Sequence, residues 1–532
     1  MELSEREKSL LFWASFLALA AAGVGFVLRV LVSPGWGAEY SITGTEVGQV
    51  FGLSLWPIAV TMILFSLIVD RVGYRLSMFI ACALQILSVI LTVIAKDVGM
   101  LKWACFAGGL GHGVIEACIN PLCAAMYTTT KSKMLNILHA SWPAGIVVGG
   151  IAYLTLGDSF ENWNQAFLLM SLPILLYGAV FAGIKKYPVD ERVMANVSNR
   201  EMLKEFGGLG ALLAVTFIVY ELTNQILGLT GDETSWIAKN LLIFSGICGA
   251  FLGSAFGFFI GSRSIDGGDA ERLSQQGLAL FARGKWLFFI LCLIMIPLAA
   301  TELGTDAWIR GLMEPVLGAE GAGWAIVASA SIMMVLRFFA GIPLKYMSPP
   351  ALLLASSIFS MFGLFMLSGA TGTMVFLAFT LYAVGQTFYW PTMLGFVSER
   401  FPKGGAMTLN TVSAMGLLTI GIFGAPFLGA VKTSYDAETV AAYATENGMP
   451  EIESHLSEAK FFLVTHDSVV ASDVLKDEAL TAEQAGTLEN LISDNGRNTL
   501  KVAALMPMTM AIAFLLILLW FRSRGGYKPV EL

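Results

Sequence analysis

The stretch that decides the fold runs from Gly108 to Met126 and reads GGLGHGVIEACINPLCAAM. It is apolar over most of its length, yet it carries His112, Glu116 and Asn120 four residues apart, so on a helix these three side chains share one face. An ionisable side chain at membrane depth is costly and by default marks a pathway for a substrate or for protons. We therefore expect a spanning helix whose polar face looks into a bundle of other helices.

The composition of the whole chain is that of a polytopic membrane protein. Of 532 residues, 56% are hydrophobic and 13% are charged, and the mean hydropathy is +0.72, whereas soluble proteins carry about 25% charged residues. The apolar run 10–32 is too long for the core of a signal peptide and predicts a first spanning helix that is retained. The six cysteines lie in apolar runs without a CxxC pair, so we expect buried thiols, no metal site and no cofactor.

Spanning a bilayer takes about 20 apolar residues, and the chain offers fourteen such runs in groups of six, two and six. The predicted fold is therefore all-α: a bundle of six helices in residues 1–190, a linker with two inserted helices in 191–285, and a second bundle of six in 286–532. The expected spans are 10–32, 45–69, 76–95, 102–126, 135–157, 165–184, 208–229, 240–261, 286–303, 322–344, 350–369, 373–397, 405–430 and 502–521.

Lysines and arginines in the short loops predict the orientation. The loops at 70–75, 131–133, 185–192 and 400–403 are basic, which places them and both termini in the cytoplasm and the chain in the cytoplasmic membrane. The longest loop, 432–500, is acidic and is expected outside, as a solvated cap of short amphipathic helices. One of those helices is expected over LSEAKFFLV, residues 456–464.

The two six-helix groups share a pattern that indicates an internal repeat. The fourth helix contains Glu-x-x-x-Asn-Pro at 116–121, and the corresponding helix of the second group contains Gln-x-x-x-Trp-Pro at 386–391. A basic loop follows each, and then Leu-Asn at 135–136 and 409–410. The order of these features predicts two pseudo-symmetric bundles.

The segment Ser66–Arg75 reads SLIVDRVGYR and joins the second and third helices. It resembles the cytoplasmic loop motif of the major facilitator superfamily, Gly-x-x-x-Asp-Arg-x-Gly-Arg-Lys, with Asp70, Arg71, Gly73 and Arg75 at matching positions. The resemblance implies a conformational latch in which Asp70 sits near a helix N-terminus or an arginine. The alternative is an ordinary basic loop without that role.

The fourth helix, with Glu116, Asn120 and Pro121, resembles the fucose/glucose–proton symporter branch of this superfamily, which carries a membrane-embedded Glu followed by Asn-Pro. The resemblance implies that Glu116 is the proton-coupling residue and that the solute is a sugar. A single buried carboxyl group can couple proton flow to a conformational cycle by taking up and releasing a proton as its access changes. The alternative is a glutamate held by His112 for packing only.

Arg29, in the first helix, departs from that branch, which tends to carry an Asp there. An arginine does not deprotonate in proteins and is no proton carrier. Three roles remain open for it: an ion pair with Glu116, a bidentate contact with an anionic substrate, or snorkelling to the outer surface.

Amide groups bond sugar hydroxyls and aromatic rings stack on sugar faces, so we look for such side chains on faces that meet the central cavity. Glu302 is expected near the outer end of its helix, either in the outer vestibule or as part of a solvated helix end. The resulting substrate-binding candidates are Arg29, His112, Asn120, His139, Trp142, Glu302, Tyr382, Gln386, Tyr389, Trp390 and Asn410.

These observations predict a secondary transporter, not an enzyme, that moves a small polar solute, a sugar by preference, together with protons by alternating access. The chain has no phosphate-cradling loop, so ATP-driven transport is unsupported. Alternatives are a transporter of an organic anion or sugar acid that uses Arg29, an exporter of drug-like molecules, and a membrane sensor or scaffold without transport. The expected partners are the solute, protons and the lipid bilayer, with no nucleic acid, and the protein is expected to be a monomer.

Overall fold

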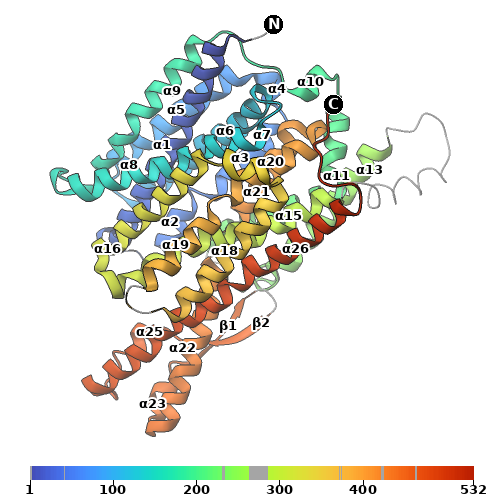
Figure 1. The fold of residues 1–532 in the computed structure, drawn as a ribbon. Helices are drawn as coiled ribbons and strands as arrows, with labels where there is room; N and C mark the ends of the chain where they lie inside the picture. The colour runs from blue at the N-terminus through green and yellow to red at the C-terminus, as the bar shows by residue number, and fades with distance from the viewer. Residues whose placement is uncertain are drawn as a thin grey trace.

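In the computed structural model of the chain, helices run between two ends (Figure 1). Both termini lie at one end, below called the N/C end, near α4 (Val69–Val72) and α10 (Glu191–Met194); the opposite end, below called the loop end, carries the projecting segment around α23 (Pro450–Glu453). The structure describes residues 3–40, 42, 44–230, 234–262, 286–370, 372, 374–420, 425–461 and 464–532.

The first half of the chain contributes a bundle in which α6 packs against α3 and α5, and α1 packs against α8 and α9. Its elements, besides α4, are α1 (Glu5–Tyr40), α2 (Gly44–Gly52), α3 (Trp56–Ser66), α5 (Tyr74–Val93), α6 (Val98–Met126), α7 (Lys131–His139), α8 (Ser141–Leu156), the 3₁₀ turns η1 (Gly157–Ser159) and η2 (Trp163–Met170), and α9 (Ser171–Gly183).

Between the halves, α11 (Asn199–Thr230) and α13 (Leu241–Ser262) pack along each other, joined by the short α12 (Trp236–Lys239). Helix α11 also contacts α15 and α21 of the second half, so this pair lies against the outside of that bundle. The polar linker 263–285 lies outside the described residues.

The second half forms the other bundle and the projecting segment. Its elements, besides α23, are α15 (Trp286–Ala299), the π-turn η3 (Ala300–Gly304), α16 (Thr305–Phe338), α17 (Gly341–Tyr346), α18 (Pro349–Gly369), α19 (Met374–Gln386), α20 (Tyr389–Arg400), the 3₁₀ turn η4 (Pro402–Gly404), α21 (Gly405–Thr419), α22 (Ala425–Asn447), β1 (Ser457–Phe461), β2 (Val464–Ser468), α24 (Ala471–Val474), α25 (Ala482–Ala503) and α26 (Leu505–Arg522).

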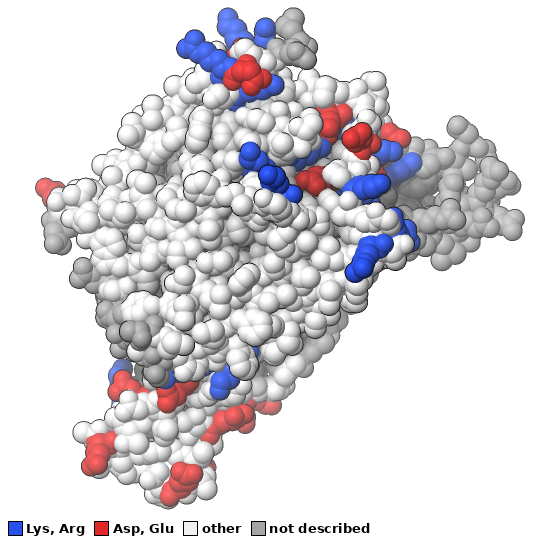
Figure 2. Space-filling view, viewed as in Figure 1, with Lys and Arg blue, Asp and Glu red and all other residues white. Residues whose placement is uncertain are grey.

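The described residues contain ten helices long and apolar enough to cross a membrane, and the apolar stretch Leu241–Phe256 is shorter. Lysines, arginines and acids gather at the two ends, with a broad uncharged band between them (Figure 2). Helix α6 is not among the ten, although it is 29 residues long, because its polar face lowers its hydropathy. The structure is therefore that of a membrane-spanning protein, and the total of fourteen spans stays a prediction.

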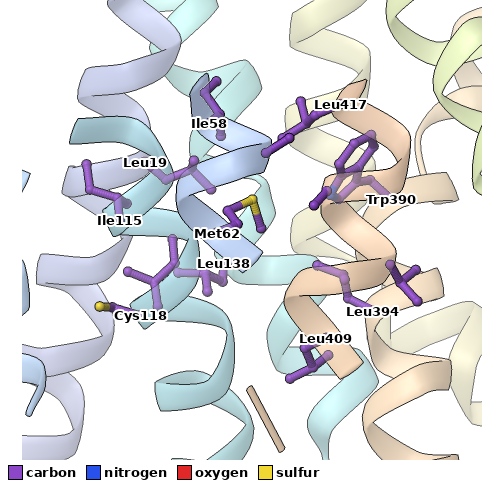
Figure 3. Packing of buried hydrophobic residues seen from close by; sticks show 14 of the residues in the cluster. Leu19, Ile58, Met62, Ile115, Cys118, Leu138, Trp390, Leu394, Leu409 and Leu417 are labelled. Atoms are coloured by element: carbon purple, nitrogen blue, oxygen red, sulfur yellow. The ribbon is translucent and has the colours of Figure 1, made fainter. Parts of the chain in front are cut away.

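One apolar core reaches across both halves. Figure 3 shows Met62, Ile115 and Leu138 of the first half in one cluster with Leu394 and Leu409 of the second. All five side chains are buried. Burial of this kind contributes roughly 25 cal/mol per Å² of apolar surface, so the halves are held together mainly by apolar contact, and the polar contacts between them set the geometry.

The expected helix over 456–464 is wrong, because β1 and β2 form an antiparallel hairpin there, with Phe461 opposite Val464. The β-branched Val464 and Thr465 favour a strand over a helix. Helices α22 and α25 run across positions 432 and 500, so the expected limits of the external loop stay a prediction.

The predicted span 373–397 is interrupted, with α19 ending at Gln386 and α20 starting at Tyr389. Pro391 lies in the first turn of α20 and has no N–H to donate to the carbonyl of Thr387, four residues earlier. The break therefore follows from the same X-Pro pair that indicated the repeat.

Candidate functional site

The polar face of α6 is buried at the centre of the molecule, as its spacing predicts. The amide nitrogen of Asn120 donates to Glu116 Oε2 at 2.6 Å, and Nε2 of His112 lies 3.7 Å from Glu116 Oε1. Glu116 is 7% exposed and Asn120 is fully buried. One carboxylate oxygen is thus fixed by an amide, while the other faces an imidazole beyond hydrogen-bond distance.

This network continues into α7. His139 Nε2 lies 2.8 Å from Asn120 Oδ1, and because an amide oxygen only accepts, the imidazole donates. The backbone oxygen of His139 in turn accepts from Nη1 of Arg337, in α16 of the second half, at 3.0 Å. Polar contacts therefore run from Glu116 through Asn120 and His139 to Arg337 and cross between the halves, with His112 facing Glu116 at their start.

Glu302 does not line an outer vestibule and is no solvated helix end, because it is buried and bound to Arg337 Nη2 at 2.7 Å. Arg337 is 1% exposed, and its Nε also donates to the carbonyl of Thr387 at 2.6 Å. A buried guanidinium needs such partners, since an unpaired buried charge is strongly destabilising. Arg337 thus joins three segments, one of them in the other half.

Prolines create several of the acceptors in these contacts. A proline in a helix leaves the carbonyl four residues earlier without its backbone donor. Pro143 leaves the carbonyl of His139 without a backbone donor, and Pro391 does the same for the carbonyl of Thr387. Arg337 donates to both carbonyls. Pro121 likewise leaves the carbonyl of Ala117.

Asn410, in α21, donates to that Ala117 carbonyl at 3.1 Å and to Ser66 Oγ at 2.7 Å. Its repeat partner Asn136, in α7, donates to Thr392 Oγ1 at 3.1 Å. The two Leu-Asn positions of the repeat therefore both reach across to the opposite half, next to its X-Pro pair. In this structure Asn410 serves that contact and not a cavity.

Arg29 lies on a small polar cavity of the first half together with His112 and Trp142. The rings of His112 and Trp142 stack at 5.1 Å with an interplanar angle of 20°. Arg29 is 7% exposed, so it does not snorkel, and among the described residues it forms no ion pair with Glu116. Contact of Arg29 with a substrate stays a prediction.

The remaining candidates lie in the second half, away from the Arg29 cavity. Tyr382 donates its hydroxyl to the carbonyl of Thr301 at 2.6 Å, and Trp390 donates Nε1 to Ser413 Oγ at 3.0 Å. Tyr389 is buried, as is Gln386, whose amide nitrogen lies 3.5 Å from Ser329 Oγ. These hydrogen bonds of Tyr382, Gln386 and Trp390 stay within their own bundle.

The loop 70–75 forms contacts of the kind that a latch requires. Asp70 is ion-paired with Arg192, and Arg75 donates to the carbonyl of Ala182 at 2.7 Å. Gly73 has φ +80°, a backbone conformation that favours glycine, and it joins α4 to α5. Arg71 is exposed.

Residues just after α9 connect this loop to both halves. Lys131 binds Glu191 at 2.5 Å. Asp190 caps α10 by accepting from the backbone N–H of Arg192 at 2.8 Å, and its carboxylate lies near Gly405 of the second half. Burial raises the pKa of Asp190 to about 6. The sequence reasoning missed this segment, although the run Asp190-Glu191-Arg192 after a spanning helix is a visible signal.

The C-terminal segment also holds the N/C end closed. Glu399, at the end of α20, accepts from Ser132 of the first half through Oε1 and from Tyr527 through Oε2, the latter at 2.7 Å. The backbone N–H of Val530 donates to the carbonyl of Glu399 at 2.8 Å. One carboxylate thus binds both the opposite half and the C-terminal segment, which sequence patterns alone did not indicate.

The fold and this site define a class: a polytopic helical membrane protein with two halves, a buried carboxylate network between them and polar contacts that close one end. Comparison with family models makes the class definite, because the model of the Major Facilitator Superfamily matches residues 11–430. The chain belongs to the major facilitator superfamily.

Solved structures agree in fold. The proton:xylose symporter XylE, bound to 6-bromo-6-deoxy-D-glucose, has a TM-score of 0.57 at 12% identity, with 97% of this chain and 96% of that chain covered. A bacterial homologue of the human lysosomal transporter Spinster has a TM-score of 0.57 at 14% identity, with 99% of this chain and 100% of that chain covered. The Escherichia coli fucose:proton symporter FucP (N162A) has 0.51 at 12%, covering 94% and 98%. A sequence search of curated proteins gave no significant match.

Proposed function

We propose that this transporter moves a small polar solute of the sugar class together with protons, by alternating access. The observation that carries the proposal is the buried path from His112 through Glu116, Asn120 and His139 to Arg337. It joins the one buried carboxylate on the polar face of α6 to a contact between the two halves. Several of the structurally similar proteins are named as sugar–proton symporters, which supports the solute class.

His112 gives the proton site a connection to the solute site. Its imidazole faces Glu116 on one side and lines the Arg29 cavity on the other, stacked against Trp142. A solute in the cavity therefore touches the group that faces the carboxylate. Occupancy of the cavity and protonation of Glu116 are coupled in this arrangement, and by linkage each changes the affinity for the other by the same factor.

The direction of closure follows from where the contacts between the halves lie. Ser132 with Glu399 lies at the N/C end, where α7 starts and α20 ends. We place this end in the cytoplasm, because the lysines and arginines of the short loops gather there. In this conformation the cytoplasmic side is closed, and opening it requires these polar contacts to break together.

The test uses purified full-length protein in liposomes that contain a pH-sensitive dye. Addition of an outside sugar panel should acidify the lumen as protons enter with the solute, and Glu116→Gln should abolish this signal while solute exchange across the membrane persists. The matched control is Glu221→Gln, a buried glutamate of α11 whose described hydrogen bond is to Gln225 within the same helix. It should leave the acidification unchanged.

Sugar uptake with an unchanged proton signal in Glu116→Gln would contradict the role of Glu116. Absence of flux for every solute in the panel would contradict the proposal of sugar transport as a whole.

A further inference from the structure

The Arg29 guanidinium is buried, and no carboxylate in the described part of the chain neutralises it. Among the described residues, its Nη2 lies 3.4 Å from Ser88 Oγ, the Cys105 thiol is a further side-chain partner, and the ring of Phe167 lies 5.5 Å from its Cζ. No described Asp or Glu lies within 4 Å of its nitrogens. Charged side chains at membrane depth normally pair with an opposite charge or with backbone carbonyls. The positive charge of Arg29 therefore lacks a counter-charge from the residues that the structure describes.

Two glycines keep space for this guanidinium. A Cβ at Gly108 would lie 2.8 Å from Arg29 Nη2, and a Cβ at Gly25 would lie 3.2 Å from Nη1. The guanidinium thereby reaches a cavity of about 20 Å³, enough for a water-sized group. The local sequence is arranged around the arginine, which is not what a side chain displaced towards lipid would need.

Hydrogen-bond donors surround the same cavity. His112 also lines the cavity, while its Nε2 lies 3.7 Å from Glu116 Oε1. Gln85 accepts from the Tyr177 hydroxyl at 3.0 Å through its oxygen, which leaves its NH₂ group as a donor, and Ser54 also lines the cavity. Among the described lining residues, Arg29 is the single Lys, Arg, Asp or Glu. A site with one cation and several neutral donors fits one negative charge.

We propose that this cavity binds the carboxylate of the solute, and that the transported sugar is therefore a sugar acid. The inference rests on the proposed function and specifies its substrate. A guanidinium binds a carboxylate through two parallel hydrogen bonds, and a monoanion matches the single charge of Arg29. A phosphate dianion would leave one buried negative charge without a partner, which is costly. The sugar ring would lie against Trp142 when the cavity widens.

This arrangement explains why Arg29 stands on the same cavity as His112. A carboxylate bound at Arg29 and the carboxylate of Glu116 lie on either side of the imidazole, so the arrival of one negative charge favours a proton on this group of residues. A monoanion that enters with one proton carries no net charge. Uptake of the acid is therefore expected to be independent of membrane potential.

The experiment compares D-glucuronate with D-glucose, which differ only at C6, by calorimetric titration of purified full-length protein. Wild type should bind glucuronate at least tenfold more tightly than glucose. Arg29→Gln should weaken glucuronate binding at least tenfold more than it weakens glucose binding, and Arg29→Lys should fall between wild type and Arg29→Gln. Thermal denaturation of each variant verifies that it is folded. Gluconate, lactate and glucose 6-phosphate extend the panel.

Four outcomes would each overturn the carboxylate site. They are equal affinity for glucuronate and glucose, unchanged glucuronate binding in Arg29→Gln, tighter binding of glucose 6-phosphate than of glucuronate, and no binding of any carboxylate. The titration needs no flux, so the two proposals fail separately. Acidification driven by glucose but not by glucuronate would keep proton-coupled sugar transport and overturn the sugar acid. Arg29-dependent glucuronate binding without proton movement would keep the site and overturn the coupling.

Discussion

Replacing Arg337 by lysine separates its charge from its shape. The guanidinium donates through three nitrogens to three acceptors: Thr387 O at 2.6 Å, His139 O at 3.0 Å and Glu302 Oε1 at 2.7 Å. A lysine keeps the charge, but its single nitrogen cannot reach three separated acceptors. We expect Arg337→Lys to keep the ion pair with Glu302 and to lose both carbonyls.

Hydrogen bonds to charged groups contribute about 1.5–3 kcal/mol each. The bond to His139 joins the halves, so its loss should shift the equilibrium between closed and open forms by roughly 10–150-fold. Spin labels at exposed Lys133 and Lys403, one in each half, report this opening as a longer distance, with the partly exposed Cys248 replaced by serine. A wild-type distance distribution in Arg337→Lys would refute the reasoning.

Pro143→Ala tests the same contact from the acceptor side. The new N–H lies four residues after His139 and competes with Arg337 for that carbonyl, while the helix itself gains up to about 3 kcal/mol from loss of the proline. We expect a more open N/C end without a fall in thermal stability. If Pro143→Ala changes neither the distance between the spin labels nor the thermal stability, then the new N–H does not compete with Arg337 for the carbonyl of His139.

Three further predictions concern stability. Burial raises the pKa of Asp190 to about 6, so folding favours the protonated carboxyl group, and the stability gained from this is lost as pH rises from about 4 to about 6. Relative to Asp190→Asn, wild type should lose about 3 kcal/mol of stability across that window. Thermal denaturation should show a difference between the two proteins that changes with pH, and a constant difference would contradict the prediction. Tyr527→Phe removes the donor to Glu399 Oε2 and should weaken the binding of the C-terminal segment to α20 by about 1–3 kcal/mol. Hydrogen exchange in the last five residues should become faster, and a control substitution far from this contact should leave it unchanged. Gly145→Ala places a Cβ 2.1 Å from a carbonyl oxygen of α1 and should cost about 1–3 kcal/mol or more, while Gly157→Ala, which meets no atom within 4 Å, should not.

Local pattern accounts for what the sequence could predict. The spacing of His112, Glu116 and Asn120 placed three side chains on one buried face, and the X-Pro and Leu-Asn pairs predicted related positions in the two halves. These features depend on helical geometry alone, which is why they survive in the structure. The helix expected over 456–464 failed because apolar content was taken for helix without weighing Val464 and Thr465 as strand formers.

Partners distant in sequence explain what could not be predicted. Arg337 meets His139 across 198 positions and Glu302 across 35, and no local pattern indicates either contact. Glu302 was therefore expected at a helix end, although in the folded chain it binds the buried Arg337. The same holds for Glu399 and Tyr527, since the course of the chain after α26 decides whether they meet.

Carbonyls freed by prolines suit a contact that must form and break. A helix that opened its own backbone bonds would pay the cost of burying unpaired polar groups, but the carbonyls of Ala117 and His139 lack an intrahelical donor in every state. When the halves part, water in the opened cavity can bond them in place of Asn410 and Arg337, so each exchange costs only about 1 kcal/mol net. Arg337 retains its partners within its own half as it releases His139. The closed form can thus have a specific geometry while its free energy stays close to that of the open form. A transporter that cycles between two forms requires this.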